Sequence, residues 1–290
     1  MLTHMLRTFN LSSMSKIEVN GTIRTYHLVV PPDQSKKSPL VIALHGFSGN
    51  AKTIERISQL SEYAEKENFF VAYPNGFGQL GNLVFSWNAN FCCANAKIHS
   101  SDDVGFIKNL INYLCSQYSI DKNKIFITGI SNGAMMTHRI GIELGNMIAG
   151  IIPVAGAIGT VYPKPFQFNI SQYPVNVILF HGLKDTFIPF DGKKGVTQNP
   201  NQFLPVRDQV KYWVTVNKCQ TEPLIEELAG EKLIKETYSS DITHKKVIFY
   251  LIKEGTHTWP GGVRGLTAAG EPVSKEICSA SQIIVDFIKA

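Results

Sequence analysis

Long apolar runs are missing from this sequence of 290 residues. No stretch approaches the roughly 20 consecutive apolar residues that a membrane-spanning helix needs, so we expect no membrane span. Residues 1–16 also lack the sustained apolar region that marks a secretory signal peptide. Charged residues make up only 18% of the chain, and its net charge of +5 comes from scattered lysine and arginine residues. That scatter argues against a nucleic-acid partner, which would favour a clustered basic patch.

Cysteine is scarce, and its spacing is informative. The chain has five cysteines, Cys92, Cys93, Cys115, Cys219 and Cys278, and no two of them stand in C-x-x-C spacing. A structural zinc site is therefore not expected, and we predict no metal and no cofactor. Cys115 falls on the apolar face of a predicted helix, which is typical of a buried thiol. Cys92 and Cys93 could contribute two separate bridges, one bridge with each other or none.

Internal repeats and low-complexity linkers are also absent, and strand and helix patterns alternate along the chain. After an expected hairpin (16–20 and 23–30), short apolar runs predict buried strands at 40–44, 69–73, 125–128, 151–154, 177–180 and 247–252. Apolar residues at helical spacing lie between them at 104–118, 136–147, 206–217 and 277–287. This alternation predicts one α/β domain over residues 17–290, after a tail of residues 1–16. Its central sheet should be mostly parallel and flanked by helices. Polar stretches at 74–101, 159–174 and 191–205 could form the rim of a cleft.

A short motif in the middle of the chain points to chemistry. The pentapeptide Gly129-Ile130-Ser131-Asn132-Gly133 follows an apolar run and precedes a helical pattern. Strand, G-x-S-x-G and helix in this order form the setting of a nucleophile elbow. Such a turn is tight enough to require small residues two before and two after the serine. The helix N-terminus beside the serine favours developing negative charge. An ordinary strand-to-helix turn can have the same local sequence, so downstream partners decide the interpretation.

Two suitable partners follow later strands. Asp185 comes after the apolar run 177–180, and His257 comes after the run 247–252. The order Ser, Asp, His is the chain order of the α/β-hydrolase triad. A serine hydroxyl is a weak nucleophile until a base takes its proton. Histidine can take and return that proton while a carboxylate fixes its tautomer. We therefore predict Ser131 as the nucleophile, His257 as the base and Asp185 as the acid.

Other polar residues near these positions have simpler interpretations. His181 lies within a strand end and Asp191 lies further along the chain, so neither replaces the predicted acid. Asp102 and Asp103 are typical of the start of the helix that follows them. His45 is better suited to bracing its loop than to acting as a base.

An ester carbonyl attacked by serine develops an oxyanion that needs two aligned N–H donors. We expect one from the backbone of Asn132, directly after the nucleophile. The other should come from the loop after the run 40–44, most simply the backbone N–H of Phe47. Trp87 and Trp259 are candidates for the wall of a substrate pocket, because flat aromatic rings suit both aryl and alkyl acyl groups. Both tryptophans could equally belong to the core.

The chain also resembles a known family, the polyhydroxybutyrate depolymerase and feruloyl esterase group of α/β-hydrolases. The resemblance runs from about residue 25 to residue 288. It rests on Leu44-His45-Gly46, Tyr73-Pro74-Asn75-Gly76, Ser86-Trp87-Asn88 with Cys92-Cys93, Asp102-Asp103-Val104-Gly105-Phe106, Gly129 to Met136, His181-Gly182 with Asp185, and His257-Thr258-Trp259-Pro260-Gly261. It implies carboxylic-ester hydrolysis through Ser131, Asp185 and His257, without a cofactor.

The expected activity is therefore that of a serine esterase acting on small or oligomeric esters. The acyl group would be a short hydroxyacyl unit of the polyhydroxybutyrate type or an aryl unit of the feruloyl type. A serine peptidase or amidase on the same fold and a catalytically silent hydrolase-like binding protein are the alternatives. Because no separate binding module follows the catalytic region, we expect soluble short esters to be better substrates than solid polymer. The family and the paired cysteines favour an extracellular location, which we expect, although the missing signal sequence favours the cytoplasm as the alternative. Composition and patterning leave the oligomeric state open.

Overall fold

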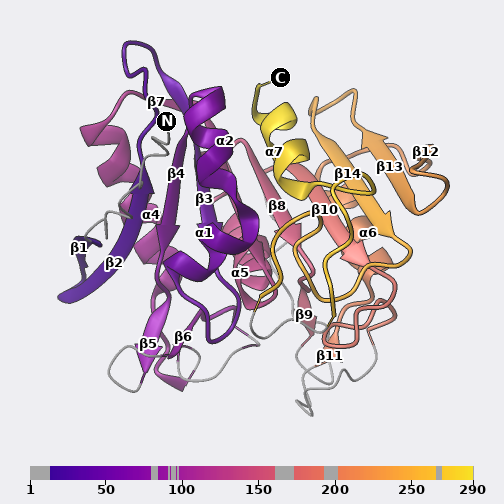
Figure 1. Ribbon diagram of the computed structural model, residues 1–290, viewed down its shortest axis with the longest axis horizontal. Coiled ribbons are helices and arrows are strands. Elements are labelled where there is room, and N and C mark those ends of the chain that lie inside the picture. Colours follow the sequence, from indigo (N-terminus) through magenta and orange to yellow (C-terminus); the bar gives the residue numbers. More distant parts are fainter. Residues whose placement is uncertain are drawn as a thin grey trace, which may run out of the picture.

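A computed structural model of the chain describes residues 14–79, 84–90, 92, 96, 98–160, 173–192, 202–265 and 270–289. Its centre is a ten-stranded sheet in the order β1-β2-β4-β3-β7-β8-β10-β14-β13-β12, with helices on both faces (Figure 1). The predicted α/β architecture with a mostly parallel central sheet is confirmed.

The parallel core of the sheet corresponds to the apolar runs of the sequence. It consists of β4 (Phe70–Pro74), β3 (Ser38–Leu44), β7 (Ile120–Ile130), β8 (Gly150–Val154), β10 (Asn176–Gly182) and β14 (Lys246–Ile252). Successive side chains of β3 enter opposite layers of the core: Leu40, Ile42 and Leu44 on one side, Val41 and Ala43 on the other. Burial on both faces explains why these strands have no polar alternation.

Antiparallel strands form both edges of the sheet. At one edge β1 (Ser15–Val19) pairs with β2 (Thr22–Val29), which pairs with β4. The turn residues Asn20 and Gly21 both have positive φ, 50° and 74°, as the expected tight hairpin requires. β1 starts at Ser15, inside the stretch expected as a tail, and residues 1–13 of that tail lie outside the described residues. At the other edge β13 (Leu233–Ser239) pairs with β14 and with β12 (Leu224–Leu228).

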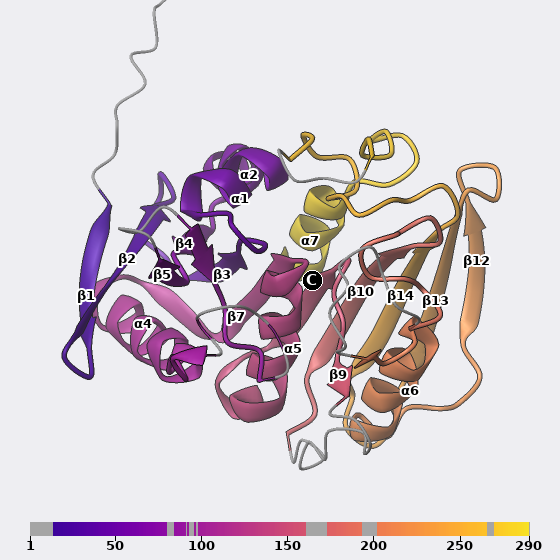
Figure 2. The same ribbon diagram turned by 90° about the horizontal axis from the view of Figure 1, so that it is seen from below.

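Among the described residues, helices cover both faces of the sheet (Figure 2). One face holds α1 (Ala51–Ser58), α2 (Leu60–Glu67) and α7 (Ala280–Lys289), and the other holds α4 (Asp103–Gln117), α5 (Asn132–Glu143) and α6 (Val206–Val216). Asp102 caps α4 by accepting the Gly105 N–H at 2.8 Å. Asp103 is fully buried and pairs with Arg24 at 2.7 Å. The interpretation of both aspartates as structural residues at a helix start is confirmed.

Shorter elements lie within the segments expected as rim loops. β5 (Phe77–Gln79) pairs with β6 (Val84–Ser86), and β9 (Gly159–Thr160) pairs with β11 (Gln202–Phe203). A 3₁₀ turn, η1 (Gly145–Met147), follows α5. Much of the remainder of these segments (80–83, 161–172 and 193–201) lies outside the described residues. Among the helices that the structure describes, none is long and apolar enough to cross a bilayer.

Candidate active site

The sheet topology brings the predicted site residues to the edge at which the parallel strands end, and not to an edge formed by an outer strand. Ser131 directly follows β7, Asp185 follows β10, and His257 follows β14. The loop that contains Phe47 follows β3. Because these four strands are parallel, their carboxyl ends lie at the same edge of the sheet, at the bottom in Figure 1. That edge is where α/β proteins collect their functional residues.

Ser131 occupies a strained turn between β7 and α5. Its backbone has φ 58° and ψ −122°, a combination that non-glycine residues rarely adopt. A Cβ on Gly129 would come within 2.7 Å of the Gly133 backbone, and a Cβ on Gly133 would come within 2.3 Å of the Leu44 carbonyl oxygen. Only glycine fits at either position, as expected for a nucleophile elbow.

His257 and Asp185 form a buried pair. His257 Nδ1 lies 2.8 Å from Asp185 Oδ2. The other carboxylate oxygen, Oδ1, accepts the backbone N–H groups of Phe187 and Ile188, each at 2.9 Å. An ionised carboxylate can only accept hydrogen bonds, so Nδ1 is the nitrogen through which His257 donates to Asp185. Residues 72 positions apart in the sequence meet in the arrangement that a general base and its orienting acid require.

The electrostatic surroundings keep Asp185 ionised. Burial alone would raise the pKa of this carboxyl group. The hydrogen bond from His257, the electrostatic interactions with His257 and His181, and the Ile188 amide outweigh burial, and the pKa of Asp185 is lowered from its ordinary value. A carboxylate that remains charged can stabilise an imidazolium that forms beside it.

Two further residues lie near this pair: Phe187, which the sequence did not single out, and His181, which was set aside there as an alternative acid. The ring of Phe187 stacks on His257, with centroids 5.2 Å apart and planes at 13°. His181 donates from Nε2 to the Ile188 carbonyl oxygen at 2.9 Å and lies 3.8 Å from Asp185 Oδ2, so it braces the same turn. The only signal for Phe187 in the sequence is its position two residues after the predicted acid.

The residues predicted to supply the oxyanion donors belong to segments next to the nucleophile. Asn132 is the first residue of α5 and is almost completely buried. A Cβ on Gly46 would lie 3.4 Å from Ser131 Cβ, so the peptide that carries the Phe47 N–H runs beside the serine. Phe47 is 46% exposed.

The two tryptophans are part of the core and expose almost no surface. Trp87 is 0% exposed, and its Nε1 donates to the His45 carbonyl oxygen at 2.9 Å. Trp259 is 1% exposed, and its Nε1 donates to Ser281 Oγ at 3.0 Å. Of the two interpretations that the sequence left open, burial favours the core over the pocket wall, because a fully buried ring has no surface for a substrate.

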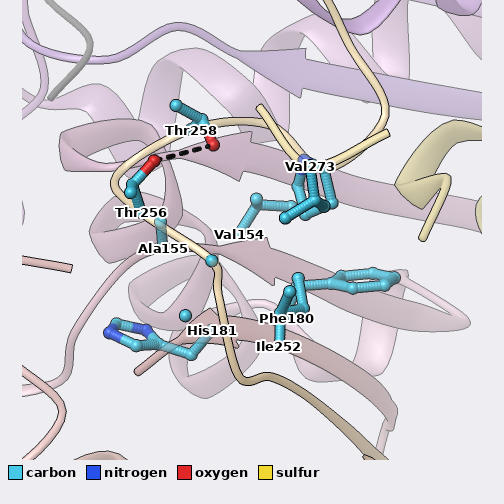
Figure 3. Close-up of a pocket in the computed structure, with 11 residues that line it drawn as sticks. Val154, Ala155, Phe180, His181, Ile252, Thr256, Thr258 and Val273 are labelled. Atoms are coloured by element: carbon cyan, nitrogen blue, oxygen red, sulfur yellow. Dashed lines mark hydrogen bonds between the residues drawn. The ribbon is translucent and has the colours of Figure 1, made fainter. Parts of the chain in front are cut away.

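A small cavity lies beside Thr256 and Thr258 (Figure 3). Its lining includes Phe180, His181, Ile252, Thr256 and Val273, and its volume is about 10 Å³. That space accommodates about one water molecule and is far too small for an acyl group. Within the described residues, no group of three or more His, Cys, Asp or Glu side chains is placed to hold a metal ion.

The cysteines are in two states. Cys92 is disulfide-bonded, so the alternative without any bridge does not hold. Cys93 lies outside the described residues. Cys115, Cys219 and Cys278 are free thiols, and burial raises the pKa of each of them. Cys115 is half-buried rather than fully buried, since one side of the α4 helix is open to solvent.

Comparisons with known proteins agree with this architecture. The sequence model of a family described as phospholipase/carboxylesterase matches residues 25–216. The chain is 24% identical over 289 residues to the putative esterase NocK of Nocardia uniformis subsp. tsuyamanensis, covering 94% of this chain and 81% of that protein. Its fold is similar to that of an acetyl xylan esterase from Aspergillus awamori, with a TM-score of 0.64 at 18% identity over 85% of this chain and 94% of the other.

Members of the resembled group also match, over shorter regions. Feruloyl esterase B of Neurospora crassa is 27% identical over 156 residues, which cover 52% of this chain and 51% of that protein. Poly(3-hydroxyalkanoate) depolymerase C of Paucimonas lemoignei is 30% identical over 128 residues, which cover 44% of this chain and 30% of that protein. The chain therefore spans only part of the length of these two relatives. The resemblance to this group of α/β-hydrolases is confirmed.

Proposed function

We propose that this chain, which belongs to the phospholipase/carboxylesterase family, hydrolyses carboxylic esters with Ser131 as nucleophile, His257 as base and Asp185 as orienting acid. The family and its relatives identify the chain as an esterase of the α/β-hydrolase fold. The assignment of residues rests on one observation above all. The buried His257–Asp185 pair, 2.8 Å apart, lies at the same sheet edge as a serine with φ 58° at the head of α5.

The chemistry follows from the hydrogen bonds of the pair. Because His257 donates a hydrogen bond from Nδ1 to Asp185, its Nε2 lone pair can take the proton of Ser131 as Oγ attacks the ester carbonyl carbon. The resulting oxyanion is stabilised by the N–H groups of Phe47 and Asn132. His257 then returns the proton to the leaving alcohol, and the acyl group remains on Ser131. A water molecule, deprotonated by His257, then attacks the acyl-enzyme. His257 returns this proton to Ser131 Oγ as the bond between the acyl group and Oγ breaks and the acid leaves.

For the substrate, we propose short hydroxyacyl or aryl esters. The names of two relatives support this choice, since one is a feruloyl esterase and the other a poly(3-hydroxyalkanoate) depolymerase. Phe47 is exposed and follows Gly46, which lies beside Ser131, and Phe187 is partly exposed and stacks on His257. Both rings offer apolar surface to such groups. Methyl ferulate and p-nitrophenyl butyrate should therefore both be hydrolysed.

A fluorophosphonate probe tests the assignment of the nucleophile. The probe forms a phosphorus–oxygen bond with an activated serine and releases fluoride, so intact-mass and peptide analysis should locate one adduct on Ser131. Ser131→Ala is the matched control and should take up no probe while keeping the wild-type thermal unfolding curve. Absence of labelling in the folded wild-type protein would favour the alternative of a silent binding protein. Faster cleavage of amides than of the matching esters would favour a peptidase or amidase.

An extracellular location is a separate proposal. The disulfide of Cys92 supports it, because disulfides persist mainly in oxidising compartments. The cytoplasm remains the alternative, and the state of the cysteines in protein from its native source distinguishes the two.

A further inference from the structure

Two hydrogen bonds to the Gly46 carbonyl oxygen hold the peptide between Gly46 and Phe47 in one orientation. The Gly46 carbonyl oxygen lies 2.7 Å from His45 Nδ1 and accepts the Gly49 N–H at 3.1 Å. In a trans peptide the N–H points away from the C=O of the same unit. The two bonds to the Gly46 oxygen therefore determine the direction of the Phe47 N–H, which is one of the two proposed oxyanion donors.

The tautomer of His45 is determined by its other nitrogen. Gly76 donates its backbone N–H to His45 Nε2 at 3.0 Å, so the ring proton must lie on Nδ1 and point to the Gly46 oxygen. The ring is completely buried, with its centroid 5.1 Å from that of Trp87. Burial, with a smaller effect from the charge of Arg24, lowers the pKa of His45 to about 4, so the ring stays neutral near neutral pH.

A second set of bonds links this loop to the residue after the nucleophile. Asn132 uses both ends of its side-chain amide on Trp87: Oδ1 accepts the Trp87 N–H at 2.7 Å and Nδ2 donates to the Trp87 carbonyl oxygen at 3.0 Å. The Trp87 indole N–H in turn donates to the His45 carbonyl oxygen at 2.9 Å. Buried hydrogen bonds thus run without a break from residue 132 through residue 87 to residue 45.

We propose that His45, Trp87 and Asn132 are positioning residues that hold the N–H groups of Phe47 and Asn132 at a fixed separation and orientation for the oxyanion. This inference rests on the proposed ester hydrolysis. It assigns a role to a tryptophan that has no surface for a substrate and to an asparagine side chain that follows the nucleophile. Since the oxyanion exists only in the transition state and the tetrahedral intermediate, the three side chains should affect kcat more than KM.

Conservative substitutions separate the proposed role from simple support of the fold. Asn132→Ala keeps the backbone N–H of residue 132 but removes both bonds to Trp87. Trp87→Phe keeps an aromatic ring but removes the donor to His45. Loss of a whole oxyanion donor costs about 10²–10³ in kcat, so a displaced donor should cost about 10- to 100-fold with p-nitrophenyl butyrate. KM should change less than about threefold, because ground-state binding does not depend on the oxyanion.

At His45, substitution by asparagine or by glutamine tests which ring nitrogen is needed for kcat. The amide nitrogen of an asparagine can take the place of Nδ1 and donate to the Gly46 oxygen. The amide oxygen of a glutamine can instead take the place of Nε2 and accept the Gly76 N–H. His45→Asn should therefore keep more of the wild-type kcat than His45→Gln, although both change the same buried ring.

Trp213→Phe is the matched control for a buried tryptophan. Trp213 is 0% exposed, lies in α6, and donates from Nε1 to His138 Nδ1 at 3.0 Å. Its replacement should lower the thermal unfolding temperature and leave kcat per folded molecule unchanged. The double variant of Asn132→Ala with Trp87→Phe should lose no more kcat than the worse single variant, since both interrupt the same chain of bonds.

A readout that does not depend on the amount of folded enzyme completes the test. Sulfur accepts N–H hydrogen bonds poorly, so the ratio of kcat/KM for an ester to that for its thionoester reports on the oxyanion donors. The ratio should fall at least fivefold in Asn132→Ala and Trp87→Phe and stay at the wild-type value in Trp213→Phe. An unchanged ratio and kcat in an active, labelled enzyme would overturn the positioning role alone. A wild-type protein that neither hydrolyses esters nor labels at Ser131 would instead overturn the proposed function.

Discussion

Replacing Asp185 by asparagine should inactivate the enzyme by changing a proton position rather than the fold. In the native site one carboxylate oxygen accepts the His257 Nδ1 proton, and the other accepts two backbone N–H groups at 2.9 Å. An asparagine has only one acceptor end. If its oxygen keeps the two backbone bonds, its NH₂ faces His257 and forces the imidazole proton onto Nε2. The base then presents a proton to Ser131 and cannot accept one.

The opposite orientation of the amide is unfavourable. Its NH₂ would point at the N–H groups of Phe187 and Ile188, which would leave two buried donors without a partner, at a cost of about 1–3 kcal/mol each. The first orientation should therefore predominate, and the wrong tautomer should lower kcat by about 10⁴ while the fold remains intact.

Steady-state hydrolysis of p-nitrophenyl butyrate, with thermal unfolding as a check on the fold, measures this effect. Nitrogen NMR of ¹⁵N-histidine-labelled protein should show the protonated nitrogen of His257 change from Nδ1 to Nε2. An Asp185→Asn variant with a tenth or more of the wild-type kcat would refute the assignment of Asp185 as the acid.

Four further measurements test other parts of the structure. Ser131→Ala should lower kcat by about 10⁴–10⁶ without a change in stability, and a variant with a tenth of wild-type activity would contradict it. Burial lowers the pKa from 6.5 to about 4 for His45 and to about 3 for His138. Below pH 6.5 the unfolded chain therefore binds more protons than the folded protein. Urea titrations should show the free energy of unfolding falling from pH 6.5 towards pH 4. Equal free energies of unfolding at pH 7 and pH 5 would contradict this. Thiol counting on unfolded protein from its native source, protected from reduction, should find fewer than five free thiols, whereas five would defeat the extracellular proposal. Hydrolysis of p-nitrophenyl esters should fall sharply for acyl chains beyond about eight carbons, and a preference for palmitate would contradict a site of ordinary size.

The parts of the fold that are buried on both sides could be predicted from the sequence. Apolar runs such as 40–44 and 177–180 became β3 and β10, because strands covered by helices on both faces admit almost no polar residue. The helices and strands that were not predicted from the sequence bury less apolar surface. α1 contains only three buried apolar residues, Ala51, Ile54 and Ile57, and begins at the capping residue Asn50. β12 is an edge strand with exposed leucines and glutamates, so its pattern lacks a buried face.

For the site, the order of the residues along the chain and their positions after strands could be predicted, but their side-chain geometry could not. Ser131, Asp185 and His257 were chosen because each follows a strand, and parallel pairing then brings such residues to one edge. Tertiary contacts decide the roles of other residues. The stacking of Phe187 on His257 and the bonds of Trp87 to two distant segments leave no periodic signal. The sequence around a tryptophan does not show whether its ring contacts a substrate or its indole N–H donates to a carbonyl group.

The order of the parallel strands also has a consequence for folding kinetics. Ser131, Asp185 and His257 follow three different strands, and β10 must pair with both β8 and β14 before they can meet. Such long-range pairings close large loops and form slowly. Ester hydrolysis should therefore return during refolding no earlier than the β10–β14 pairing, whereas far-ultraviolet circular dichroism reports helices that can form before it. A colorimetric ester assay therefore gives a time by which the β10–β14 pairing has formed.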